Sequence, residues 1–204
     1  MRLHTKLMIA GVISLAAATA NADVIFADDF DTSGGSTLNW LGGANWTVNN
    51  GTVDLVKSGE YRISCLFNTG HCVDLDGSTR TAGEIESIDV GPLNPGRYEF
   101  SYWLSGNQRN TTVDMMAALS LSTGGSLSFA FHQLNGADGW QQFTQTFTLT
   151  SVTTPVTLRF SHQGADNIGI LLDNVSLRSV PEPGTLALLG LGLIGIGAAR
   201  RRKA

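Results

Sequence analysis

The side chains of this 204-residue chain that could do chemistry are mainly carboxylates. Asp74 and Asp76 lie two positions apart in the string VDLDGS, so on a strand they would share one face. Hydrolysis of a glycosidic bond requires two carboxylates that flank the bond across a cleft. However, Asp-Gly is a strong turn signal, and an aspartate in a turn accepts backbone hydrogen bonds. We therefore favour the turn for Asp74 and Asp76. The sequence also contains no pattern that pairs carboxylates across a cleft.

Nucleophilic catalysis would need a serine or cysteine beside a histidine and an orienting group. The chain after residue 22 holds His71, His132 and His162, but no G-x-S-x-G elbow. We interpret these three histidines as surface or strand residues and predict no enzyme activity. A secreted hydrolase that acts on polysaccharide remains the alternative from the enzyme class.

Sugar recognition is the binding chemistry that the sequence favours. It rests on exposed aromatic rings that stack on pyranose faces, beside polar groups that bond hydroxyls. In the strand expected at residues 97–104, Trp103 falls on the face opposite to Tyr98 and Phe100. The polar loop that follows contains Asn107, Gln108, Arg109 and Asn110. We interpret Trp103 and this loop as candidate ligand-binding residues, although any solvent-exposed turn can have the same composition.

Short strands must position these residues. Apolar residues recur at every second position in runs at 97–104, 112–121, 127–131, 143–149 and 156–161, each bounded by Gly, Pro, Ser, Thr or Asn. The run 168–177 is more continuously apolar, which is typical of a strand covered on both faces. No convincing amphipathic helix appears. These short alternating runs, separated by turn residues, predict an all-β sandwich domain at residues 23–179.

Charge disfavours nucleic acid as a partner of this domain. From residue 23 to residue 180 there are 16 acidic and 7 basic residues, a net charge of −9. Such a surface repels phosphate backbones. The basic residues outside this range lie in the two terminal segments.

Residues 1–22 have the pattern of a secretory signal peptide. Arg2 and Lys6 precede an apolar run at 7–18, and Ala20 and Ala22 provide small residues at the −3 and −1 positions. The run is shorter than the ~20 residues of a membrane-spanning helix, so we expect cleavage before Asp23.

The predicted export bears on the redox state of the two cysteines. Cys65 and Cys72 bracket the string CLFNTGHC, and exported proteins fold where thiols are oxidised. A metal site with His71 is the weaker alternative, because a stable zinc site needs four ligands and no second pair lies nearby. We predict a disulfide that staples a loop.

The last segment, residues 180–204, cannot extend a soluble sandwich. An apolar, Gly-rich stretch at 185–199 would measure ~22 Å as a helix, short of the ~30 Å of a bilayer core. An ordinary tail anchor is one interpretation. We favour a transient stop-transfer segment with its basic end on the cytoplasmic side.

This segment resembles the PEP-CTERM sorting signal of Gram-negative bacteria. The resemblance is carried by Pro181, Glu182 and Pro183, by the apolar stretch, and by the basic end with Arg200, Arg201 and Arg202. It implies transient anchoring in the inner membrane, cleavage near the Pro-Glu-Pro motif by an exosortase, and delivery to the cell surface or exterior. Members of that group are associated with exopolysaccharide in biofilm or floc.

The middle of the chain resembles galactose-binding-like jelly-roll domains, which are common among PEP-CTERM proteins. The strings that carry this resemblance are YRISCLFNTGHCVDLDGSTRTAGEIES, PGRYEFSYWLSGNQRN, GWQQFTQTFT and DNIGILLDNVSL. The resemblance implies a jelly-roll β-sandwich and a structural Ca²⁺ of the kind that such sugar-binding domains often hold.

Asp173 is the candidate for that calcium, because it lies inside an apolar run. A carboxylate there is costly unless it is hydrogen-bonded or metal-bound. Asp28, Asp29 or Asp31 could supply further oxygen ligands. The alternative is that Asp173 accepts hydrogen bonds from backbone N–H groups.

These observations predict an exported, non-catalytic surface or matrix protein that binds or associates with exopolysaccharide. A purely structural matrix protein without a small ligand is a second alternative, beside the hydrolase. The sequence names neither the sugar nor the oligomeric state.

Overall fold

The structure is a computed structural model that describes residues 22–109, 113–118, 130–164 and 166–181, and the single positions 192 and 201. The chain divides into two compact units, one spanning Ala22–Val180 and one made of the two terminal segments. The signal peptide expected at 1–22 falls almost wholly outside the described residues. So do Glu182, Pro183, Arg200 and Arg202 of the sorting segment.

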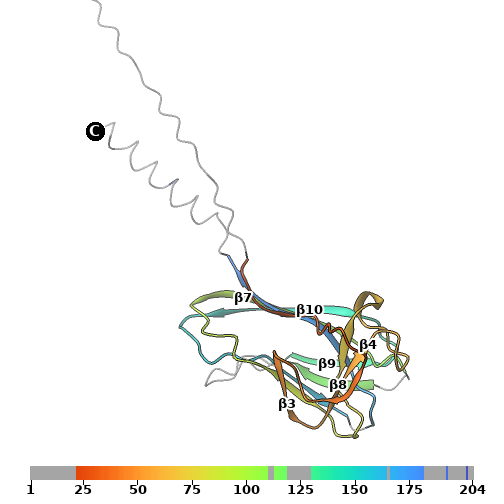
Figure 1. Cartoon of the computed structure of the whole chain (residues 1–204). Helices are drawn as coiled ribbons and strands as arrows, with labels where there is room; N and C mark the ends of the chain where they lie inside the picture. Colours follow the sequence, from red (N-terminus) through yellow and green to blue (C-terminus); the bar gives the residue numbers. More distant parts are fainter. Residues whose placement is uncertain are drawn as a thin grey trace, which may run out of the picture. The chain divides into compact units, whose positions relative to one another are not determined.

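Two antiparallel sheets build the Ala22–Val180 unit (Figure 1). The seven-stranded sheet has the order β10 (Gln141–Leu149), β7 (Gly96–Ser105), β12 (Leu171–Val180), β5 (His71–Asp74), β4 (Val53–Lys57) and β2 (Thr37–Trp40), and β1 (Val24–Asp28) also pairs with β12. The five-stranded sheet has the order β3 (Trp46–Asn50), β6 (Glu84–Ser87), β11 (Arg159–Gln163), β8 (Val113–Ala118) and β9 (Ala130–Asn135). A short 3-10 turn covers Leu66–Asn68. The predicted all-β sandwich is confirmed.

The main core fills the space between the sheets. In β7, residues alternate between buried and half-buried, and Phe100 and Tyr102 are completely buried. Their rings contact Phe160 of β11, with ring centroids 5.9 Å and 5.3 Å away. Trp103 falls on the opposite face of β7, as the period of two predicts.

Strand β12 changes partners part-way along its length. One edge pairs with β7, whereas the other pairs with β5 through Leu171 and Leu172 and then with β1 from Val175 onward. A bulge between Asp173 and Ser176 lies at the change. Because a bulge adds a residue to one strand, it changes which side chains face outward and which face the core.

A second apolar cluster lies on the outer face of the seven-stranded sheet. Val56, Cys72 and Leu171 point away from the main core, because their neighbours in sequence point into it. Ile63 and Cys65 of the segment 58–70 pack on them. This segment therefore covers part of the sheet's outer face, and we call it the stapled loop.

Some strands of the structure begin later than the sequence pattern predicts. The run at 156–161 becomes strand only from Arg159, and the run at 168–177 only from Leu171. The expected strand at 127–131 corresponds to β9, which starts at Ala130, and its residues 127–129 lie outside the described residues. Strands β1 to β6 were not predicted, because they are short and most lack clean alternation.

Candidate functional site

A groove of about 570 Å³ lies on the outer face of the seven-stranded sheet. Its sheet residues come from β1, β7, β10 and β12, and the segment after β1 together with Asn45 contributes the remainder. The lining is mostly polar and includes Asp29, Asp31, Ser101, Gln142, Asn174 and Ser176. These side chains can bond hydroxyl groups in several directions.

An aromatic pair borders this polar groove. Trp103 lines the groove, and its ring lies edge to face with Phe67, with centroids 6.1 Å apart and an interplanar angle of 63°. Phe67 is 73% exposed, which is unusual for a large apolar side chain. Its φ of 57° lies in the left-handed region, where a non-glycine residue is strained. Sequence reasoning missed Phe67; an aromatic residue inside a short loop closed by two cysteines was the available signal.

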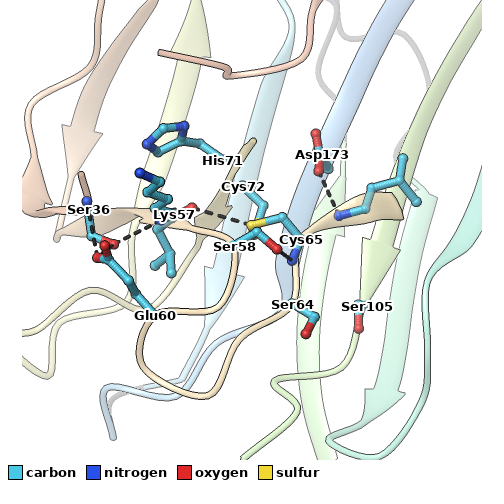
Figure 2. Close-up of a disulfide and its surroundings, with 12 residues drawn as sticks. Ser36, Lys57, Ser58, Glu60, Ser64, Cys65, His71, Cys72, Ser105 and Asp173 are labelled. Carbon is cyan, nitrogen blue, oxygen red and sulfur yellow. Dashed lines mark hydrogen bonds between the residues drawn. A yellow bond between two sulfur atoms is a disulfide. The ribbon is translucent and has the colours of Figure 1, made fainter. Parts of the chain in front are cut away.

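The stapled loop positions Phe67 beside the sheet. The predicted disulfide is confirmed, with the Cys65 and Cys72 Cα atoms 5.4 Å apart (Figure 2). At the base of the loop, Ser58 donates its N–H to the Gly70 carbonyl and accepts the Cys65 N–H on its hydroxyl. The loop is thus closed by a covalent bond and by backbone hydrogen bonds.

The polar loop after β7 braces the stapled loop from the other side. Asn107 is completely buried. Gln108 accepts the Ser64 N–H at 2.8 Å and donates to the Ser64 carbonyl at 3.0 Å. Arg109 forms an ion pair with the buried Asp74. These three side chains contact the protein itself, and Asn110 lies outside the described residues.

Asp173 connects the sheet with the stapled loop. It is 3% exposed, and it accepts the N–H groups of Leu66 at 3.1 Å and of Asn174 at 2.8 Å. Figure 2 draws the first of these two hydrogen bonds. Burial raises the pKa of Asp173 to about 7, the two N–H donors lower it, and nearby Asp31 and Asp29 raise it further. Of the two interpretations of Asp173, the geometry fits the one in which its carboxylate accepts hydrogen bonds from backbone N–H groups.

Of the other proposed calcium ligands, Asp29 and Asp31 lie near Asp173, whereas Asp28 is engaged by the protein. Asp28 accepts three hydrogen bonds, from the Phe30 N–H, the Asn45 amide and the Trp46 indole. Within the described part of the chain, no group of three or more His, Cys, Asp and Glu side chains is arranged to hold a metal ion. We therefore derive no role for calcium.

Asp74 and Asp76 lie at the end of β5, where both are buried. Asp74 accepts the N–H groups of Asp76 and Gly169, and Asp76 accepts the Asp166 N–H, as expected for a turn. Burial raises the pKa of Asp74 to about 7, although the adjacent Arg109 guanidinium lowers it. The two carboxylates are thus used in holding loops together.

The three histidine side chains each contact a different polar group of the protein. His71 contacts the Thr32 hydroxyl, and His132 shares a 2.6 Å hydrogen bond with Tyr102. His162 accepts the Ile170 N–H at 3.4 Å on Nε2, and burial lowers its pKa. The structure does not bring these histidines to the groove.

Comparison with known proteins identifies the C-terminal segment. Residues 179–203 match the PEP-CTERM protein-sorting motif. The segment carries a PEP-CTERM sorting signal. This motif indicates export with a membrane-anchored sorting step. In the described part of the chain, no helix has the length and apolar character needed to span a bilayer.

Solved structures with a similar β-sandwich include carbohydrate-binding and adhesin domains. The CBM22-1 xylan-binding domain from Paenibacillus barcinonensis is 15% identical, with a TM-score of 0.45, covering 81% of this chain and 100% of that one. A cleaved adhesin domain of Lys-gingipain from Porphyromonas gingivalis is 15% identical, with a TM-score of 0.49 and coverages of 79% and 100%. A carbohydrate binding module of Cellvibrio mixtus lichenase 5A, solved with cellotriose, is 12% identical, with a TM-score of 0.39 and coverages of 78% and 100%. No curated protein matches the chain.

Proposed function

We propose that this protein is an exported, non-catalytic surface or matrix protein that binds exopolysaccharide in the groove beside Trp103 and Phe67. The observation that carries the proposal is the pair of the half-buried Trp103 and the exposed Phe67 at the border of a polar groove. Aromatic faces bind the apolar faces of sugar rings, and the polar lining bonds the hydroxyl groups around them.

The groove is suited to a polymer chain. It lies on the outer surface of a sheet, and its volume of about 570 Å³ exceeds that of one sugar ring. Gln142 and Asn174 offer both donors and acceptors, which matches hydroxyl groups. Trp103 belongs to a long central strand, and Phe67 belongs to a loop closed by a disulfide, so both rings are held before a ligand arrives.

Sorting brings this domain to the polysaccharide. In this proposal, residues 1–22 are removed as a signal peptide and the C-terminal segment anchors the chain transiently in the inner membrane. An exosortase then cuts near Pro181, and residues 23–179 reach the cell surface or the exterior. The sorting motif at 179–203 supports this route.

The test is a glycan array together with pull-down on insoluble polysaccharides, using the purified Ala22–Val180 unit, which has its own core. We expect Trp103→Ala to weaken binding at least about tenfold, or roughly 1.4 kcal/mol, and Phe67→Ala to weaken it less. Phe131→Ala is the matched control, because Phe131 is an exposed aromatic residue on β9 of the other sheet.

Two outcomes would overturn the proposal. Absence of binding to every glycan would favour a purely structural matrix role. Equal binding by the Trp103→Ala variant and the unaltered domain would move the sugar site away from the groove.

A further inference from the structure

In the part of the chain that the structure describes, the charged residues that line the groove are all acidic. They are Asp28, Asp29 and Asp31, and the buried Asp173 lies close enough to the last two for their charges to raise its pKa. Among the described residues, no lysine or arginine lines the groove. The described side of the groove therefore carries an uncompensated negative potential.

The basic side chains of the described residues are engaged elsewhere or lie outside the groove. Arg109 forms an ion pair with Asp74, and Arg178 forms one with Glu99. Arg159 forms ion pairs with Glu84 and Glu86 of β6. None of these ion pairs involves a groove carboxylate. A concave surface with charges of one sign concentrates its field, so the groove attracts cations and repels anions.

Asp29 and Asp31 have oxygens available for a ligand. Both residues are exposed. Asp29 accepts the Asp31 N–H on Oδ1, and Asp31 accepts the His71 N–H on Oδ1, which fixes both carboxylates in place. Among the described residues, Oδ2 of each accepts no hydrogen bond. Asp28, by contrast, has both oxygens occupied by the protein.

Trp103 provides a second attraction for positive charge. An ammonium group near an indole face is attracted by the negative charge of that face, and more strongly where water is displaced. A ring that also packs on the apolar face of a sugar makes this a site for a cation attached to a sugar, because a bare metal ion would gain nothing from such packing.

We propose that the groove selects polysaccharides that carry free amino groups, such as partly deacetylated amino-sugar polymers, over neutral ones and over uronic acid polymers. This inference rests on the proposed function of the same groove. The ammonium group binds to Asp29 and Asp31, while the sugar ring packs beside Trp103. Uronic acid polymers are excluded because their carboxylates meet like charges.

The experiment compares three oligosaccharides of equal length by calorimetry on the Ala22–Val180 unit at about pH 6, where an amine is protonated and exposed carboxylates are ionised. The probes are a glucosamine oligomer, its N-acetylated counterpart and an oligogalacturonate. We expect the glucosamine oligomer to bind at least about tenfold more tightly than the acetylated one, and the advantage to shrink in high salt. We expect no binding of the oligogalacturonate.

The variant Asp29→Asn/Asp31→Asn should abolish the advantage of the amine, so that the glucosamine oligomer and its acetylated counterpart bind to it with similar affinity. Asparagine retains the Oδ1 acceptor that each position uses in the fold. The control is Asp89→Asn/Asp166→Asn, which changes the net charge equally at carboxylates that do not line the groove. That control should leave the advantage intact.

The outcomes separate this inference from the proposed function. Binding of both amino-sugar oligomers with equal affinity would overturn the amine preference and leave the sugar site in place. An advantage lost equally in the control variant would also overturn it, because the attraction would then come from overall charge. Absence of binding by every probe, on the array as well, would overturn the proposed function and this inference with it.

Discussion

Asp173 links the strands beside the groove to the stapled loop. Its carboxylate lies across from Trp103 in the sheet register and accepts the Leu66 N–H beside Phe67. A backbone N–H donated to a carboxylate forms a stronger hydrogen bond than one donated to a neutral acceptor. One buried side chain therefore holds the loop against the strand that carries the tryptophan.

This burial predicts a specific pH dependence of stability. The pKa of Asp173 is about 7 in the folded state and about 3.9 in the unfolded chain, so the folded state binds more protons between these values. The contribution is fully present below about pH 4 and is lost as the pH rises through about 7, with a slope of at most ~1.4 kcal/mol per pH unit. Urea unfolding at about pH 4, 5.5 and 7 measures it.

The Asp173→Asn variant should have a flatter profile over the same pH range. Part of the slope should remain, because burial also raises the pKa of Asp74. Asp23→Asn, at an exposed position, is the control and should keep the original slope. An unchanged slope in the Asp173→Asn variant would show that this carboxyl does not titrate on unfolding.

At the scale of elements, the stapled loop links the second apolar cluster to the binding surface. Cys65 and Cys72 pack in that cluster, while Phe67, between them in sequence, points to Trp103. Gln108 and the Trp140 indole hold the same loop through Ser64. The loop is therefore braced at its base, along one side and by Asp173.

We predict that Cys65→Ala/Cys72→Ala lowers the melting temperature by roughly 5–10 °C. The cysteines are seven positions apart, and closing so short a loop contributes about 2.5 kcal/mol in the chain-entropy account. Sugar binding should weaken as well, because Phe67 is no longer held. Differential scanning calorimetry measures the first effect.

Reductant provides the control for this variant. It should lower the melting temperature of the unaltered domain and leave that of the double variant unchanged. Equal melting temperatures for the two oxidised proteins would show that hydrogen bonds alone hold the loop.

At the scale of the whole molecule, two parts of the chain have separate tasks. The Ala22–Val180 unit has its own core and groove, whereas the segment from residue 179 to residue 203 carries the sorting motif. Changes in one part should therefore leave the task of the other part intact.

We predict that replacing Pro181, Glu182 and Pro183 with alanine leaves the protein in the membrane fraction and unprocessed. The rigid Pro-Glu-Pro entry is the part of the motif that a processing enzyme can recognise outside the apolar stretch. Cell fractionation with mass spectrometry of the product measures the effect. Thr185→Ala is the control within the same segment. Normal release of the triple variant would contradict the sorting route.

Much of the fold could be predicted from the sequence, because the relevant signals are local. The alternation in β7 placed Trp103 opposite to Tyr98 and Phe100, since successive strand residues face opposite sides. Two cysteines in an exported chain implied the disulfide, which the structure contains. The sorting motif could also be identified from its residues alone, because it is a contiguous string.

Only the tertiary structure decided where the candidate site lies. The loop at 107–109 had the composition of a sugar-binding loop, yet Gln108 binds Ser64, 44 positions earlier. Asp173 had two open interpretations, and its partner Leu66 lies 107 positions away. Phe67 became a candidate only when folding placed it beside Trp103. Local patterns report which face of a strand a residue occupies, but contacts between distant segments depend on how the loops pack on the sheet, and no short-range pattern encodes that packing.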